Sequence, residues 1–135
     1  MWDAQQAIIE ANLSFYEAFA TGDATAMARV WARNEPVVCI HPGWQPLYGR
    51  DQVLASWRAI FREDSPAIRC EGARVTFLDT VAHVTCVERI RAGKLAATNI
   101  FIQEEGVWRM VHHQASPFMD QPLPPSVIPP PGSLN

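Results

Sequence analysis

The chain has 135 residues, of which 48% are hydrophobic, 10% aromatic and 19% charged. This length fits one domain, and the composition excludes an intrinsically disordered protein. The formal net charge is −3 and the eleven basic residues are scattered, so the basic patch of a nucleic-acid-binding protein is lacking. No apolar run is long enough to span a bilayer, and the N-terminus lacks the features of a signal peptide. We therefore expect a cytoplasmic protein that contacts neither membranes nor nucleic acids.

In most of the first sixty residues, apolar side chains recur at the spacing of an α-helix. Asp3 with Gln6 three positions later indicates a capping box before a helix, and Gly22 indicates its end. Apolar residues recur at steps of three and four along the segments that follow such capping residues. The sequence therefore predicts three helices: one near residues 4–20, a second that begins after Asp23 and ends near Arg33, and a third capped by Asp51.

Extended segments make up most of the remaining chain. Val37 to His41 is rich in β-branched residues and too short for a helix, so it predicts a strand, with a loop over residues 42–49. Turn signals then separate four longer segments, residues 67–77, 81–91, 95–104 and 107–115. Helices followed by hairpins predict an α+β domain over residues 1–118, with helices on one face of a curved antiparallel sheet. Residues 119–135 form a proline-rich tail that we expect outside the sheet.

Glu88 is the polar residue on the more apolar face of its predicted strand. Strand alternation places it with Ala82, Val84 and Cys86, because neighbouring side chains point to opposite faces. A carboxylate there has to be paired, hydrogen-bonded or raised in pKa, which is typical of functional sites. The alternative is an ion pair at the strand end with an arginine such as Arg58 or Arg109.

Histidines are the other candidates for acid–base chemistry, because their ordinary pKa near 6.5 suits proton transfer. Alternation places Trp108, Met110, His112 and Gln114 on one face and His113 on the other, so the two adjacent histidines cannot enter one pocket. His41, one of these two and Glu88 could at most form a three-donor set. Cys39, Cys70 and Cys86 lack paired spacing and are interpreted as reduced core thiols. We expect no cofactor and no transition metal.

Aromatic residues are numerous enough to line an apolar ligand cavity, although each would equally serve as ordinary core. The candidates for ligand contact are these aromatic side chains together with two polar residues of the last strand: Tyr16, Trp44, Trp57, Phe101, Trp108, His112 and Gln114.

Several local motifs carry a family resemblance. They are Thr21-Gly22-Asp23, His41-Pro42-Gly43-Trp44, Gly49-Arg50-Asp51, residues 97–101 and residues 108–116. Over about residues 3–118 the chain resembles the SnoaL-like branch of the nuclear transport factor 2 (NTF2)-like superfamily, which includes ketosteroid isomerases. The resemblance implies a cone-shaped, cystatin-like α+β barrel in which three helices close over a strongly curved sheet around an apolar pocket. It also supports a homodimer through the outer face of the sheet, where we expect Val75 or Phe77, Val87 and Val111 to be exposed.

The resemblance also suggests positions for chemistry. The family's general base, an aspartate before a proline, falls on His41. The tyrosine of its oxyanion hole falls on Phe15 with Tyr16 adjacent, and its second oxyanion donor falls near Thr98 or Asn99. We expect His41, Glu88 and Asn99 to be catalytic: His41 as base, Asn99 as hydrogen-bond donor and Glu88 as the group that orients a histidine.

The expected function is binding, and isomerisation, cyclisation or dehydration, of a small apolar or polycyclic metabolite without a cofactor. The alternative is a non-catalytic ligand-binding or association module, because this fold serves many functions. A filled interior favours the alternative, whereas a cavity with convergent polar groups favours a ligand.

Overall fold

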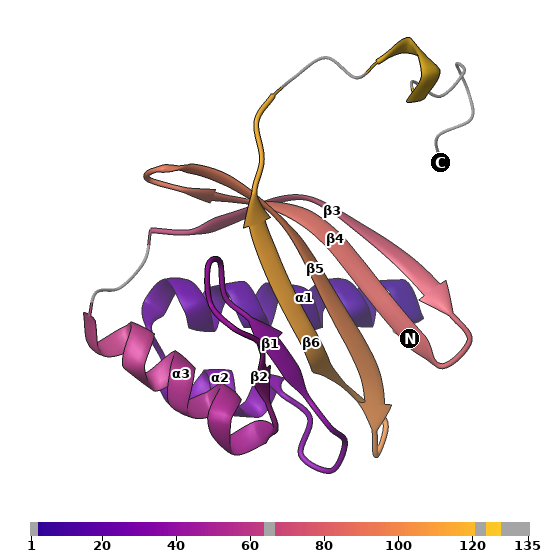
Figure 1. The fold of residues 1–135 in the computed structure, drawn as a ribbon. Helices are drawn as coiled ribbons and strands as arrows, with labels where there is room; N and C mark the ends of the chain where they lie inside the picture. Colours follow the sequence, from indigo (N-terminus) through magenta and orange to yellow (C-terminus); the bar gives the residue numbers. More distant parts are fainter. Residues whose placement is uncertain (1–2, 64–66, 121–123, 128–135) are drawn as a thin grey trace.

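The computed structural model describes residues 3–63, 67–120 and 124–127, which form helices packed on a six-stranded sheet (Figure 1). The elements in chain order are α1 (Ala4–Thr21), α2 (Ala24–Val30), β1 (Val38–Ile40), β2 (Leu47–Tyr48), α3 (Arg50–Glu63), β3 (Arg69–Leu78), β4 (Val81–Ile90), β5 (Gly93–Glu104), β6 (Val107–Pro117) and a 3₁₀ turn, η1 (Pro125–Val127). The predicted α+β class, with three helices and four long strands, is confirmed.

Two aspartates cap the first two helices as predicted. Asp3 accepts a 2.7 Å bond from the Gln6 amide, and Asp23 accepts a 3.0 Å bond from the Ala26 amide. Gly22 ends α1 in the left-handed conformation, with φ of 68°, which a residue without Cβ adopts at little cost. The prediction that Asp51 caps the third helix is wrong: α3 begins at Arg50, so Asp51 lies in its first turn.

The sheet has the order β2-β1-β6-β5-β4-β3. Strands β3 to β6 form the predicted antiparallel meander, whereas β1 pairs in parallel with β6 and antiparallel with β2. The two-residue strand β2 lies in the segment predicted as loop, where no alternation could reveal it. Within the described residues, no helix has the length and apolar character that crossing a membrane requires.

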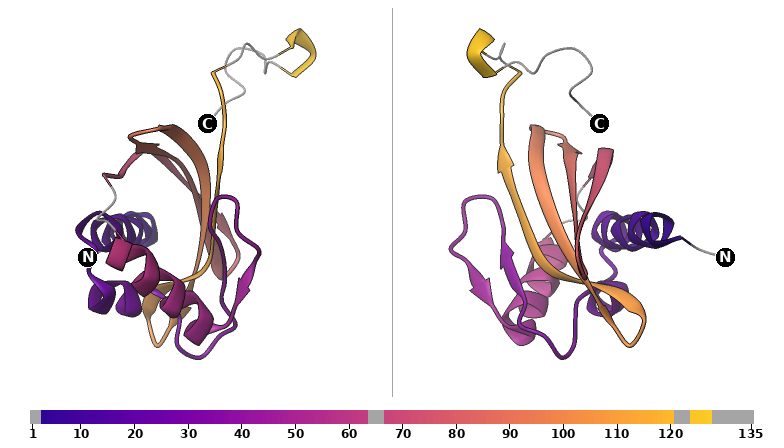
Figure 2. Two further views of the ribbon diagram at one scale, coloured as in Figure 1. Left: turned by 60° about the vertical axis from the view of Figure 1, so that its left-hand side comes forward. Right: turned by 90° about the vertical axis from the view of Figure 1, so that its right-hand side faces the viewer.

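The sheet curves strongly around the helices, as expected, and remains open (Figure 2). Strands β2 and β3 are its two edges. Helix α1 contacts both β3 and β6, so a helix, rather than strand pairing, spans the concave side. The concave face and the helices together enclose the core.

A β-bulge in β6 changes which side chains face this core. Ile100 pairs with His112, whereas its neighbour Phe101 pairs with Met110, so Val111 is an extra residue in β6. Met110 and His113 are therefore both buried, at 0% and 1% exposure. The expected strict alternation, with His112 and Met110 on one face, is wrong because the extra residue reverses the pattern between them.

The proline-rich tail is described only in part. Strand β6 extends to Pro117, and Pro125–Val127 form a 3₁₀ turn rather than a polyproline helix. The remaining expectation for the tail falls on residues 121–123 and 128–135, which lie outside the described residues.

Candidate functional site

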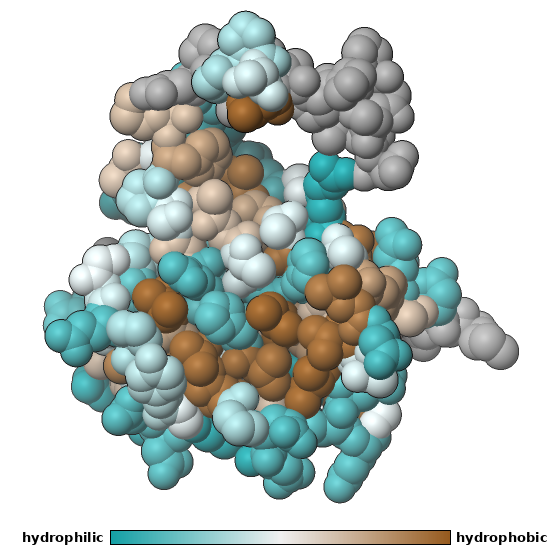
Figure 3. Space-filling view, turned by 45° about the vertical axis from the view of Figure 1, so that its right-hand side comes forward, coloured by the Kyte–Doolittle hydropathy of each residue, from teal (hydrophilic) through white to brown (hydrophobic). Residues whose placement is uncertain are grey.

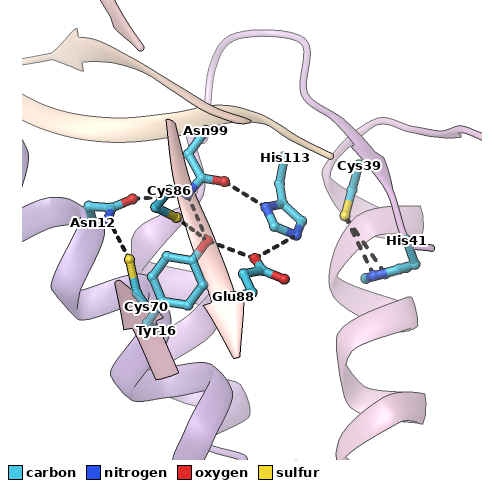
Figure 4. A network of polar contacts seen from close by, with 9 residues as sticks. All are labelled: Asn12, Tyr16, Cys39, His41, Cys70, Cys86, Glu88, Asn99 and His113. Atoms are coloured by element: carbon cyan, nitrogen blue, oxygen red, sulfur yellow. Dashed lines mark hydrogen bonds and ion pairs between the residues drawn. The ribbon is translucent and has the colours of Figure 1, made fainter. Parts of the chain in front are cut away.

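A polar cluster lies in the apolar interior between α1 and the concave face of the sheet (Figure 4). At its centre the Tyr16 hydroxyl donates to Glu88 Oε2 over 2.7 Å. Glu88 is 1% exposed and Tyr16 5%. Helix periodicity places Tyr16 on the same face of α1 as Ile8, and strand alternation places Glu88 on the concave face of β4. The carboxyl is thus held by a hydroxyl rather than by an arginine.

Asn99 on β5 links the other members of the cluster. Its Nδ2 donates to Asn12 Oδ1 over 2.9 Å and to the Tyr16 hydroxyl over 3.1 Å. Its Oδ1 lies 2.6 Å from His113 Nδ1. Because the amide oxygen can only accept, His113 Nδ1 carries the proton and its Nε2 presents a lone pair. That Nε2 lies 3.8 Å from Glu88 Oε2.

Burial controls the protonation of these groups. It raises the pKa of Glu88 to about 7, although the hydrogen bond from Tyr16 acts in the opposite direction. It lowers the pKa of His113 to about 3, with further lowering by His41 and His112. The His113 ring is therefore neutral near pH 7, and its contact with Glu88 is not an ion pair. Burial and the nearby Glu88 also raise the pKa of Tyr16, which keeps its hydroxyl protonated.

Two thiols border the cluster. Cys86 Sγ lies 3.2 Å from the Tyr16 hydroxyl, and Asn12 Nδ2 donates to Cys70 Sγ over 3.6 Å. Since the Tyr16 proton is given to Glu88, the Cys86 thiol is the donor in its contact with Tyr16. Cys39, Cys70 and Cys86 are all free, as predicted.

His41 is buried, at 3% exposure, and forms its hydrogen bond with a residue of α3. Its Nε2 lies 2.9 Å from Ser56 Oγ, whose hydroxyl donates to the Val53 carbonyl over 2.6 Å. His41 Nε2 is therefore the donor to Ser56. Burial lowers the pKa of His41 to about 4. The structure joins Glu88 and Asn99 through Tyr16 and gives His41 a separate site.

Trp57 packs near both His41 and the polar cluster. The Trp57 ring centroid is 4.7 Å from that of His41 and 6.0 Å from that of His113. Trp57 is 1% exposed, and its indole Nε1 has no hydrogen-bond partner among the described residues. A buried donor without an acceptor is costly, which points to an acceptor that the described part of the chain does not supply.

The remaining expected ligand contacts divide between interior and surface. Phe101 is fully buried near Asn99, and Trp44, a residue 46% exposed, packs on His41. Trp108 is half-buried near Phe77. His112 and Gln114 pair with Ile100 and Thr98 and lie on the outer face. These two residues do not share the interior with Glu88.

Sequence reasoning missed two members of the interior, Asn12 and Ser56, and it listed His112 as a ligand contact where the structure buries His113. Asn12 lies four residues from both Ile8 and Tyr16, so a polar residue within an apolar helical stripe was the available signal. His113 was hidden by the bulge. Across the described ranges, no three histidine, cysteine, aspartate or glutamate side chains are grouped so that they could hold a metal ion.

Comparison with known proteins places this arrangement in a family. The model of the SnoaL-like domain matches residues 8–121. The F-box protein SKIP8 of Arabidopsis thaliana is 32% identical over 114 residues, which cover 82% of this chain and 49% of that protein. The chain thus spans about half the length of this curated relative.

Two solved structures share both the fold and moderate identity. A candidate dehydratase of the NTF2-like family from Streptomyces avermitilis has a TM-score of 0.76 and 30% identity, covering 84% of this chain and 95% of its own. A candidate calcium/calmodulin-dependent protein kinase type II association domain from Thiobacillus denitrificans has a TM-score of 0.74 and 32% identity, covering 81% and 93%. The chain belongs to the SnoaL-like family within the NTF2-like superfamily.

Proposed function

We propose that the protein binds a small, largely apolar metabolite in its interior and transfers a proton on it through Glu88. The observation that carries the proposal is the contact of the Tyr16 hydroxyl with both Glu88 and Asn99 in an apolar, buried environment. A carboxyl with a pKa near 7 is poised to accept and to return a proton at neutral pH. The reaction class is isomerisation, cyclisation or dehydration by acid–base chemistry.

Each neighbour of Glu88 has a role in this proposal. When Glu88 accepts a proton from the substrate, it becomes a weaker acceptor, so the Tyr16 hydroxyl is released to donate to the developing negative charge. Asn99 Nδ2 is the second donor next to that hydroxyl. The lone pair of His113 Nε2, 3.8 Å from Glu88 Oε2, faces the protonated carboxyl and orients it, while Glu88 keeps the proton and returns it to the substrate. His41, given the base role from sequence, is proposed instead as a polar contact on the far side of Trp57.

Apolar surroundings and an unpaired donor support a ligand in this interior. Phe15, Trp57 and Phe101 are buried around the polar cluster, and they suit an aromatic or polycyclic body. The Trp57 indole lacks an acceptor, which a ligand oxygen would supply. Because the residues of the cluster are at most 5% exposed, a ligand can enter only if part of the protein moves. We propose that the moving part is Trp44, the exposed aromatic residue that packs on His41.

Proton exchange tests this proposal without knowledge of the substrate. A panel of cyclic and polycyclic ketones is incubated with the protein in D₂O, and loss of the proton signal next to the carbonyl is followed by NMR. We expect acceleration by the wild-type protein and a loss of about 100-fold or more in Glu88→Gln, the typical contribution of a general base. Tyr48→Phe, at a tyrosine 64% exposed, is the matched control. Equal rates in wild type and Glu88→Gln would contradict the proposal.

A second function, association of two copies, is favoured by the outer face of the sheet. Figure 3 shows apolar side chains gathered there within a hydrophilic surround. Register and strand alternation place Val87 and Ile100 on this face, both partly exposed. Val75 and Phe77 pair with the buried Val84 and Ala82, so they lie on the concave side, contrary to the expectation from sequence. We propose that Val87 and Ile100 belong to a homodimer interface.

A further inference from the structure

A second face of α1 borders a groove that the polar cluster does not use. The groove has a volume of about 870 Å³ and lies between α1, α2 and the turn that joins β5 to β6. Figure 2 shows α1 and this turn projecting on the same side of the sheet. The first residues of β6, Val107, which is 48% exposed, and the half-buried Trp108, form one wall.

The residues of α1 that line the groove follow a seven-residue repeat. Its small residues recur at alternating steps of three and four, which are the a and d positions of a heptad: Ala4, Ala7, Ala11, Ser14, Ala18 and Thr21. Three acidic residues, Asp3, Glu10 and Glu17, recur every seven residues, each directly before an a position. They occupy the g positions, which in coiled coils pair with charges on the partner helix.

This seam lies beside the face of α1 that builds the core, and the two meet at Ala18, which is 2% exposed. The core face carries large residues such as Ile8, Phe15 and Tyr16. Small side chains at a and d instead allow a second helix to approach closely, and a 3.5-residue repeat keeps the seam facing a partner along its length. Trp108 and Val107 add an apolar wall against which that partner can pack.

Charge determines which helix fits. Four carboxylates line the groove, from Asp3, Glu10, Glu17 and Asp23, against one guanidinium, from Arg29. A second copy of α1 would bring acidic residues against acidic residues, which is unfavourable. A helix with lysine or arginine beside an apolar seam would meet opposite charges at about 10 Å intervals, the length of seven helical residues.

We propose that this face of α1 is the docking site for a basic amphipathic helix of another protein. The apolar a and d residues of that helix pack on the small-residue seam and on Trp108. Its basic flank pairs with Glu10 and Glu17.

Two synthetic helical peptides of three heptads test the proposal. Both carry leucine and alanine at a and d; one has lysine at e and g, and the other has glutamate there. Binding to the full chain is measured by fluorescence anisotropy. We expect the lysine peptide to bind more tightly and added salt to weaken its binding. Two exposed charge pairs, each changed from attraction to repulsion, predict roughly a 30-fold loss of its affinity in the Glu10→Lys/Glu17→Lys variant.

Two further variants separate this site from general charge attraction and from misfolding. Glu35→Lys/Glu63→Lys changes the net charge equally at exposed residues away from the groove, and we expect it to keep the preference for lysine. Ser14→Trp, at an exposed seam position, should weaken binding by steric blockage while circular dichroism remains unchanged. Failure of the lysine peptide to bind, equal affinity for both peptides, or equal losses in the two double variants would overturn the proposal.

Discussion

The Tyr16 hydroxyl donates to Glu88 Oε2 over 2.7 Å, although the two residues lie 72 positions apart in the sequence. One belongs to the first helix and the other to the fourth strand, so the bond forms only when α1 lies across the concave face of the sheet. The same hydroxyl accepts from Asn99 Nδ2, which fixes its orientation. The folding of the domain and the assembly of its polar site are therefore coupled through this pair.

Removal of the Tyr16 hydroxyl should lower stability. Tyr16→Phe leaves the buried Glu88 and Asn99 each with one partner fewer, which predicts a loss of about 1–3 kcal/mol in the free energy of unfolding. Urea denaturation of the wild type and of the two tyrosine variants measures this change in the free energy of unfolding. Tyr48→Phe, at an exposed tyrosine, should change stability by less than about 0.5 kcal/mol. Equal stability of Tyr16→Phe and wild type would show that the bond contributes nothing.

Glu88 should make stability fall with rising pH over a defined window. Because its pKa is raised from 4.5 to about 7 in the folded chain, the folded state binds the proton more tightly than the unfolded state. Its contribution is therefore fully present below pH 4.5 and is lost as the pH rises through 7. The shift corresponds to about 3 kcal/mol.

The variant Glu88→Gln isolates this effect, because His41 and His113 act in the opposite direction. Burial lowers the pKa of both rings, so their protonation in the unfolded state makes stability rise with pH up to about 6.5. The difference in unfolding free energy, wild type minus Glu88→Gln, cancels these terms. We expect that difference to decrease by about 3 kcal/mol between pH 4.5 and pH 7. A difference independent of pH would mean that Glu88 titrates normally.

The outer face of the sheet should mediate self-association. We expect a homodimer at micromolar concentration by light scattering, and a shift to monomer in Ile100→Asp, which introduces a carboxylate into the proposed interface. Leu13→Asp is the control, because Leu13 is 51% exposed on α1. A wild-type monomer, or equal shifts in both variants, would refute the interface.

Folding and ligand binding should not require a transition metal. A zinc site needs three or four converging donors, and we expect dialysis against a chelator to leave the thermal midpoint unchanged. Elemental analysis of untagged protein provides the direct measurement. Near-stoichiometric zinc, nickel or iron that survives dialysis, and is lost in His41→Ala, would replace the acid–base proposal with a metal site.

Local patterns were sufficient to predict most of the fold. The caps Asp3 and Asp23, the left-handed Gly22 and the turns between the long strands follow from short-range preferences, and the structure has them in place. The parallel pairing of β1 with β6 and the two-residue strand β2 depend on contacts between distant segments. No local periodicity encodes such contacts.

The candidate site could be predicted only in part for the same reason. Glu88 stood out because it breaks an apolar alternation, and this signal survives in the folded sheet. The partners of Glu88 come from other elements, so the sequence left open a histidine or an arginine, and it did not indicate Tyr16, which the structure has beside His113. His41 occupies a recognisable position but forms its hydrogen bond with Ser56 on α3.

The bulge at Val111 determines which of two adjacent histidines in the last strand faces the interior. His112 and His113 are adjacent and have the same side chain. The register in which β6 pairs with β5 decides which of the two rings enters the interior. If the strand kept Val111 but paired without the bulge, Val111 would lie opposite Ile100 and His112 opposite Asn99, so the two rings would exchange places without any change of side-chain chemistry. Relatives in which this strand pairs without a bulge should therefore be compared by the direction of each side chain, since the same alignment column can hold an interior histidine in one protein and a surface residue in another.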